Sequence, residues 1–219
     1  MKFIQSSDWH SAISVIQDRL KEELAASKKV LWLVSGGSNI AACTTVMRGL
    51  PQNMTKSLTV MLADERYGTV DHPDSNATQL QAAGFDPQFA TIIQVLIPNT
   101  SFEATRDRYD RLARQAFVDN DIVMGQLGIG TDGHIAGILP NSDAVKSPDF
   151  VAAYSIPPYQ RLTLTHHALK RVSVCYVLAF GDSKKPALEL LATKLVPYAE
   201  QPAQILKELP EAYVFNDQL

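Results

Sequence analysis

A glycine-rich segment that holds one aspartate and one histidine is the part of this sequence best suited to chemistry. It reads Gly128-Ile-Gly-Thr-Asp-Gly-His134 and follows the apolar run from Ile122 to Leu127. A neutral imidazole accepts a proton from water near neutral pH, because its unperturbed pKa is about 6.5. His134 is therefore a candidate general base, and Asp132 lies on the same turn. The alternative is that a lone histidine on a turn is structural.

The same segment matches the G-x-G-x-x-G pattern of dinucleotide-binding sites. Such a site needs a long helix directly after the glycines and an acidic residue at the end of the next strand. Pro140 leaves room only for a short helix, and Asp149 precedes the next predicted strand instead of ending it. We therefore do not expect a nicotinamide cofactor.

A second glycine-bearing segment, Ser35-Gly-Gly-Ser-Asn39, lies between an apolar strand and a predicted helix. Its glycines, Gly36 and Gly37, let the backbone approach a ligand closely. The helix start that follows offers unpaired N–H groups and a partial positive charge. An anion such as a phosphate suits this place, and so does an ordinary strand-to-helix turn.

Charged residues follow two further predicted strands. Asp64-Glu65-Arg66 comes directly after an apolar run and continues toward Ser75 and Asn76. Charges at such a place are costly unless they are solvated or used, so this segment is either a solvated loop or part of a site. Ser75 and Asn76 also suit a helix cap.

Two later segments carry cations that can neutralise a phosphate. Arg161 precedes a short apolar strand, and Lys184 and Lys185 lie at a strand-to-helix junction. Guanidinium and ammonium groups are the usual phosphate partners in proteins. Exposed lysines without any ligand are the alternative.

Apolar runs alternate with amphipathic stretches along the whole chain. This alternation predicts an α/β fold with an open, largely parallel, Rossmann-like sheet and helices on both faces, and residues 1–219 as a single domain. Ligands bind outside the carboxyl ends of the strands in such sheets, so the polar segments are expected to meet there. The predicted strands cover residues 30–34, 58–63, 92–96, 121–127, 151–155, 161–165, 172–180 and 212–215, and the predicted helices residues 8–26, 40–50, 183–195, 201–208 and a stretch that begins with a Thr100–Glu103 capping box.

Composition narrows the class of partner. The net charge is -3 and no basic run is present, which argues against nucleic acid. The longest apolar runs are far shorter than the roughly 20 residues that span a bilayer, so no membrane segment is expected. Cys43 and Cys175 sit in apolar surroundings and are expected to be reduced thiols of a cytoplasmic protein. A small molecule is the expected partner, and the sequence leaves oligomeric partners open.

Other catalytic classes lack their motifs. The sequence has no G-x-S-x-G elbow, P-loop, C-x-x-C or H-E-x-x-H. Asp132 and His134 alone are too few for a metal site. No metal and no organic cofactor are therefore expected.

Together the segments resemble the 6-phosphogluconolactonase family, which is related to the glucosamine-6-phosphate isomerases and deaminases. The similarity runs from about residue 31 to about residue 206. Five motifs carry it in order, and they are Ser35-Gly-Gly-Ser38, Asp64-Glu-Arg66 with Ser75-Asn76, Gly128-x-Gly-x-Asp132-Gly-His134-x-Ala136 with Pro140, Pro157-Pro158-x-x-Arg161-Leu-Thr-Leu-Thr165, and Gly181-x-x-Lys184.

The resemblance implies hydrolysis of a 6-phosphogluconolactone in the pentose phosphate pathway. It implies that His134 activates water and is oriented by Asp132, and that Arg66 stabilises the oxyanion that develops on the lactone carbonyl. It implies that Asp64 and Glu65 shape the sugar end of the site. The implied substrate- and phosphate-binding residues are Ser35, Gly36, Gly37, Ser38, Asn76, Arg161 and Lys184.

Two other functions remain alternatives. The related deaminases carry a glutamate just before the proline that closes the glycine-rich motif, where this chain has Leu139, and a tyrosine at the position of Arg66. A sugar-phosphate sensor without catalysis is the other alternative. Such sensors normally follow a helix-turn-helix domain, and the 29 residues before the first predicted strand are too short for one.

The chain departs from the family pattern at three places. Asn39-Ile40 stands where the phosphate loop usually continues with Thr-Pro, and Gly68-Thr69 stands where Val-Pro usually follows the D-E-R motif. Gly137 replaces a serine that usually follows His-x-Ala. None of these positions carries a proposed catalytic group, so we expect them to affect efficiency or substrate range.

Overall fold

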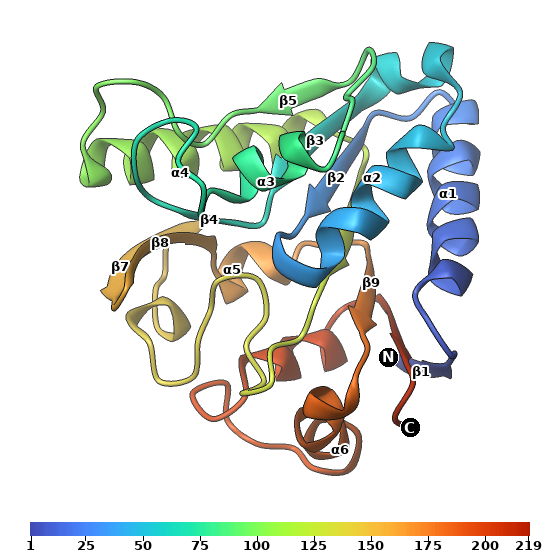
Figure 1. The fold of residues 1–219 in the computed structure, drawn as a ribbon, viewed down its shortest axis with the longest axis vertical. Coiled ribbons are helices and arrows are strands. Elements are labelled where there is room, and N and C mark those ends of the chain that lie inside the picture. The colour runs from blue at the N-terminus through green and yellow to red at the C-terminus, as the bar shows by residue number, and fades with distance from the viewer.

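The computed structural model describes residues 1–219 and is built around a seven-stranded sheet (Figure 1). Its strands are β1 (Lys2–Gln5), β2 (Val30–Val34), β3 (Leu58–Leu62), β5 (Thr91–Ile93), β6 (Ile122–Leu127), β9 (Val174–Ala179) and β10 (Glu211–Asn216). They lie in the order β1-β10-β9-β6-β2-β3-β5, and every neighbouring pair is parallel. The predicted open parallel sheet is confirmed.

Helices connect these strands. The α-helices are α1 (His10–Ala25), α2 (Ile40–Arg48), α3 (Asn76–Ala82), α4 (Phe102–Asp119), α5 (His166–Leu169) and α6 (Lys185–Thr193). In Figure 1, α1 and α2 lie side by side, and α3 packs against α2. Because β6 lies on the other side of β2 from β3 and β5, the chain runs back across the sheet between β5 and β6, and this connection contains α4.

A second, three-stranded sheet stands beside the main one. It consists of β4 (Asp64–Arg66), β7 (Val151–Ile156) and β8 (Tyr159–Leu164), which pair antiparallel in the order β4-β8-β7. α4 packs against β7. The segment 64–66, for which a loop was one of two expectations, is therefore a short strand that extends the polypeptide away from β3 and into this smaller sheet.

The core is one contiguous cluster of 59 buried apolar residues. All residues of β2, β6 and β9 are buried, because helices or the small sheet cover both faces of these central strands. Cys43 and Cys175 belong to the core and are unpaired thiols, as predicted. None of the helices has both the length and the apolar composition needed to cross a bilayer.

The ends of several elements differ from the predictions. The N-cap of α4 is Ser101, whose Oγ accepts from the Ala104 N–H, so the predicted cap at Thr100 is wrong by one residue. Residues 202–207 form a 3₁₀ helix instead of an α-helix, and β1 was not predicted because its four residues show no strong pattern. Pro186 does lie in the first turn of α6, where its missing N–H costs nothing.

The strand order creates one place suited to a ligand. The chain leaves β2 toward β3 on one side, whereas β6 lies on the other side of β2. The carboxyl ends of β2 and β6 therefore flank a topological switch point, at which ligands bind in open parallel sheets. The two glycine-rich segments, 35–39 and 128–134, follow these two strands directly.

Candidate active site

A pocket of about 200 Å³ opens at this switch point and gathers most of the predicted residues. It draws on the loop after β2, the loop after β6, the strands β4 and β8 of the small sheet, the start of α3, and the 3₁₀ turn before α6. Its lining includes the predicted residues Ser35, Gly36, Gly37, Ser38, Asp64, Arg66, Asn76, His134, Arg161 and Lys184.

His134 and Asp132 form a hydrogen-bonded pair at the β6 side of the pocket. The imidazole Nδ1 lies 2.6 Å from Asp132 Oδ1, and the same oxygen accepts from the His134 backbone N–H at 3.1 Å. Partial burial opposes ionisation of Asp132, but the hydrogen bond with His134 outweighs it and lowers the pKa of this carboxyl to about 2. An ionised carboxylate only accepts, so Nδ1 carries the proton and Nε2 of the neutral ring has the free lone pair.

The turn that presents His134 depends on glycine at two positions. A Cβ at Gly130 would lie 2.0 Å from His134 Nδ1, and Gly133 has a φ of +82°. The N–H of Gly130 donates to the carbonyl of His134 and closes the turn. The imidazole therefore packs directly against the backbone of Gly130, where any side chain would collide with it.

The loop after β2 presents backbone donors to the pocket. Gly37 has a φ of +61° with no atom within 4 Å of a Cβ position, so the loop can bend sharply before the 3₁₀ turn Gly37–Asn39. The N–H groups of Gly36, Gly37 and Ser38 have no acceptor within the protein. Unused donors at a helix start are the usual cradle for a phosphate.

Two arginines lie directly opposite each other on the small sheet. Arg66 of β4 is the cross-strand partner of Arg161 of β8, and both line the pocket. Arg66 Nη1 donates to the carbonyl of Asp74, and the buried Nε atoms of both arginines have no acceptor. Like charges at directly opposed positions repel. The pocket therefore holds two guanidinium groups that an anion would stabilise.

Asp64 is the buried carboxylate of the pocket. Only 7% of the residue is exposed, and burial raises its pKa, although Arg66, Arg161 and His134 act in the opposite direction. Its carboxylate can accept hydrogen bonds from hydroxyl groups of a sugar. Asp64 lines the pocket, and its role at the sugar end of a substrate stays a prediction.

Glu65 does not line the pocket. Its side chain accepts four hydrogen bonds, from the N–H groups of Arg66, Asn76 and Ala77 and from the Ser75 hydroxyl. Burial nevertheless raises the pKa of this carboxyl. Glu65 thus holds the start of α3 against β4, whereas the sequence analysis placed it at the sugar end of the substrate.

The two lysines before α6 differ in position. Lys184 lines the pocket, and burial lowers its pKa against the opposing charge of Asp132. Lys185 is outside the pocket and exposed, and its Nζ lies 4.0 Å from Glu189 on the surface of α6. The backbone N–H of Gly181 donates to the side-chain carboxylate of Asp217 and so anchors the turn that carries Lys184.

Asn39 is a pocket residue that the sequence analysis treated only as a departure from the family pattern. It is 2% exposed, and its Oδ1 has no hydrogen-bond partner. Its amide lies against Gly128, where a Cβ would come within 2.6 Å of Nδ2. The signal that could have found it is its place directly after the glycines, at the turn that begins α2.

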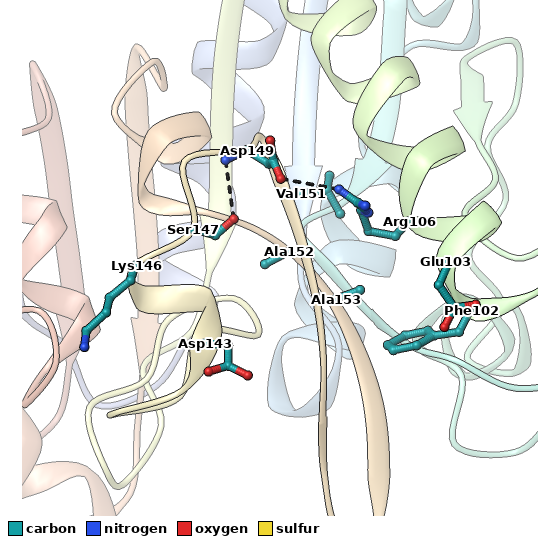
Figure 2. Close-up of a pocket in the computed structure, with 10 residues that line it drawn as sticks. All are labelled: Phe102, Glu103, Arg106, Asp143, Lys146, Ser147, Asp149, Val151, Ala152 and Ala153. Carbon is teal, nitrogen blue, oxygen red and sulfur yellow. Dashed lines mark hydrogen bonds and ion pairs between the residues drawn. The ribbon is translucent and has the colours of Figure 1, made fainter.

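No three His, Cys, Asp or Glu side chains come together as a metal-binding group in this fold. A larger hollow of about 420 Å³ lies between the start of α4 and β7 (Figure 2). Its charged groups include Arg106, which lies 3.3 Å from Asp149, and the hollow contains none of the predicted site residues. The smaller pocket at the switch point is therefore the candidate active site.

Comparisons with known proteins identify the family of this chain. The model of the family described as glucosamine-6-phosphate isomerases/6-phosphogluconolactonase matches residues 6–214. A 6-phosphogluconolactonase of Pseudomonas aeruginosa is 30% identical over 184 residues, which cover 79% of this chain and 76% of the relative. A 6-phosphogluconolactonase of Helicobacter pylori is 27% identical and covers 94% and 91%.

Solved structures show the same fold. The crystal structure of a 6-phosphogluconolactonase from Thermotoga maritima superposes with a TM-score of 0.83 at 20% identity and covers 98% of this chain and 97% of that chain. The crystal structure of a 6-phosphogluconolactonase from Shewanella baltica also gives a TM-score of 0.83, at 21% identity, and covers 98% and 96%. At these identities the likeness concerns the fold.

Proposed function

Because this chain belongs to the family of glucosamine-6-phosphate isomerases and 6-phosphogluconolactonases, we propose that it is a 6-phosphogluconolactonase. It hydrolyses 6-phospho-D-glucono-1,5-lactone to 6-phosphogluconate, a step of the pentose phosphate pathway. One observation carries the proposal. The pocket brings together the imidazole of His134, which is hydrogen-bonded to Asp132, and three cationic side chains that form no ion pair. These cationic side chains are Arg66, Arg161 and Lys184.

His134 acts as the general base in this proposal. Nε2 takes a proton from water while the water oxygen attacks the lactone carbonyl carbon, and Asp132 holds the ring through Nδ1. The tetrahedral intermediate then collapses, the bond from the carbonyl carbon to the ring oxygen breaks, and the imidazolium returns its proton to that oxygen. The acid that forms ionises to the carboxylate. No covalent intermediate is needed, because a lactone is an activated ester.

The cations divide between the two ends of the substrate. Arg161, Lys184 and the N–H groups of the 35–38 loop bind the phosphate, and Asn76 supports that loop, because Asn76 Oδ1 lies against Gly36. Arg66 stabilises the oxyanion at the carbonyl carbon, a contribution of about 3–4 kcal/mol for a well-placed donor. Asp64 accepts hydrogen bonds from sugar hydroxyls.

The position of Leu139 favours this reaction over deamination. Leu139 is a partly buried apolar residue that packs against the core, at the position where the related deaminases carry a glutamate. Deamination with ring isomerisation needs more proton transfers than lactone hydrolysis, and this chain has no carboxylate there to assist. We further infer that the reaction takes place in the cytoplasm, since two unpaired buried thiols suit a reducing compartment.

The direct test is the decay of enzymatically generated 6-phosphoglucono-δ-lactone with and without the protein, corrected for spontaneous hydrolysis. We expect faster decay with the protein and no ammonia release from glucosamine 6-phosphate. The variant His134→Asn is expected to reduce kcat by about 10²- to 10⁴-fold, the usual contribution of a general base. Calorimetry should show that this variant still binds 6-phosphogluconate.

The control for this variant is His10→Asn, because His10 is exposed at the start of α1 and lies outside the pocket. It is expected to keep the turnover of the unmodified protein within about threefold. If the unmodified protein binds 6-phosphogluconate without accelerating lactone decay, the sensor function replaces the enzyme.

A further inference from the structure

Tyr159 is the aromatic residue shared by the two arginines of the pocket. The guanidinium carbon of Arg66 lies 5.4 Å from the centre of the Tyr159 ring, and that of Arg161 lies 5.3 Å from the same centre. Both distances fall within the range of cation–π attraction. One ring therefore contacts both guanidinium groups.

The sheet register explains why the three side chains meet. Tyr159 and Arg161 are two residues apart on β8 and so point to the same face of the small sheet. Arg66 is the direct cross-strand partner of Arg161 and the diagonal neighbour of Tyr159. Diagonal neighbours across an antiparallel pair remain within reach of aromatic and long side chains.

The arginines have little else to hold them. Neither guanidinium group forms an ion pair with a carboxylate. Arg161 has no side-chain hydrogen bond, and Arg66 has one, to the carbonyl of Asp74. Two like charges at opposed positions would otherwise swing apart into solvent, since long side chains have many rotamers.

We propose that Tyr159 is a positioning residue that holds the guanidinium groups of Arg66 and Arg161 together over one ring, ready for an anionic substrate. The ring offsets part of their repulsion and removes rotamer freedom before the ligand arrives. Tyr159 itself does not line the pocket. It therefore acts through the arginines, and its hydroxyl has no part in this role.

The substrate in this proposal rests on the proposed function, whereas the anion-binding role is measured separately with inorganic phosphate. The test compares Tyr159→Leu, which removes the ring, with Tyr159→Phe, which keeps it. Calorimetry with inorganic phosphate and steady-state kinetics with the lactone are run on both variants. Thermal melting establishes that each variant is folded.

We expect Tyr159→Leu to raise the phosphate Kd and the lactone KM by about fivefold, which corresponds to the loss of the cation–π contact of Arg161, the arginine that binds the phosphate in the proposed function. Its kcat should fall by a smaller factor, through Arg66. Tyr159→Phe should keep all three values within about twofold of the unmodified protein. A salt titration should show that Tyr159→Leu has a weaker dependence of phosphate affinity on ionic strength, because the charges no longer converge.

Tyr213→Leu serves as the matched control. Tyr213 also carries a cation over its ring, Lys2 at 5.9 Å, but it lies on β10 away from the pocket. This variant should bind phosphate like the unmodified protein. Unchanged phosphate binding in folded Tyr159→Leu, or an equal loss in Tyr159→Phe, would overturn the proposal. Lactone turnover absent from the unmodified protein would instead overturn the proposed function alone.

Discussion

At the scale of single residues, some charged groups line the pocket, and others hold neighbouring groups in place from outside it. His134 and Asp132 share one short hydrogen bond, and Asp132 lies behind the imidazole, outside the pocket lining. Glu65 resembles a catalytic carboxylate in sequence, yet its four hydrogen bonds commit it to the start of α3. A carboxylate with all its lone pairs in use has no capacity left for a substrate hydroxyl.

We predict that Asp132→Asn lowers kcat by about 10²- to 10⁴-fold, with a smaller change in KM. The amide can donate to Nδ1, and it then selects the tautomer that carries the proton on Nε2, which cannot accept a proton from water. Steady-state kinetics of lactone hydrolysis measure this effect. A kcat close to that of the unmodified protein would show that the ring is oriented by other contacts.

The same variant should alter acid stability. The pKa of Asp132 is about 2 in the folded protein and about 3.9 for an unperturbed aspartate. A lowered folded pKa stabilises the protein above the unfolded value, so this contribution is present above about pH 4 and is lost as the pH falls toward 2. Urea unfolding of the unmodified protein and Asp132→Asn should therefore differ at pH 6 and converge near pH 2.

The sequence grouped the residues that line the pocket, but it did not indicate the aromatic residue that contacts two of them from outside it. His134, Arg161 and Lys184 follow or flank predicted strands, so the rule that ligands bind at carboxyl ends of parallel strands was enough to group them. Tyr159 gave no such signal, whereas Asn39 directly follows the glycines after the predicted strand 30–34. The Tyr159 ring contacts both arginines only because of the register between β4 and β8, and this register cannot be predicted from the sequence.

At the scale of elements, the small sheet supplies one wall of the site and the main sheet supplies the other. β4 brings Asp64 and Arg66 to the pocket, and β8 brings Arg161. The strand at residues 64–66 could not be predicted from the sequence, because three residues are too few to show an alternating pattern. The same residues suited either a solvated loop or part of a site. The longer strands of the main sheet were predicted to within a few residues because their apolar runs are continuous.

Gly137 shows how a departure from the family pattern is accommodated by its neighbours. A Cβ there would lie 2.9 Å from Thr163 Cβ and 3.0 Å from Asp64 Cβ. The Gly137 N–H donates to Thr163 Oγ1, and the carbonyl accepts from the Tyr154 hydroxyl. The loop after β6 thus packs directly on the small sheet, and the serine usual in the family does not fit without displacement.

We predict that Gly137→Ser destabilises the protein by about 1–3 kcal/mol, the typical cost of overpacking, and lowers kcat/KM by moving Asp64. Chemical denaturation and lactone kinetics measure the two effects. Ala25→Ser is the control, because it adds a hydroxyl at the exposed end of α1. Stability and kcat/KM equal to those of the control would show that the two sheets can separate slightly without cost.

At the scale of the whole molecule, one apolar cluster joins both sheets and all the longer helices. Composition and pattern were enough to predict an open parallel sheet, whereas the strand order was not predictable. Order depends on which apolar faces pack best, and the central strands β2, β6 and β9 of this chain are all buried throughout. That residues 1–219 fold as a single domain stays a prediction.

The two thiols report on the integrity of this core. Cys43 and Cys175 are fully buried, and burial raises the pKa of each to about 12. We predict that the native protein reacts with a thiol-specific reagent at pH 8 only at the rate at which it unfolds, because only the thiolate is nucleophilic. Absorbance of the released reagent in native buffer and in urea measures this rate. Rapid reaction of either thiol in native buffer would show local opening of the core.

The anchoring of the Lys184 turn by Asp217 has a practical side for anyone handling this protein. Asp217 and Gln218 hold Gly181 and Asp182 of the turn before Lys184, whereas residues 2–5 form the outer strand of the main sheet. Shortening the chain after Asn216 is therefore expected to loosen the turn that carries Lys184 at the pocket. A tag, a fluorophore or a fusion partner is therefore better attached at Met1, which lies at the start of the outer strand and away from the turn that carries Lys184.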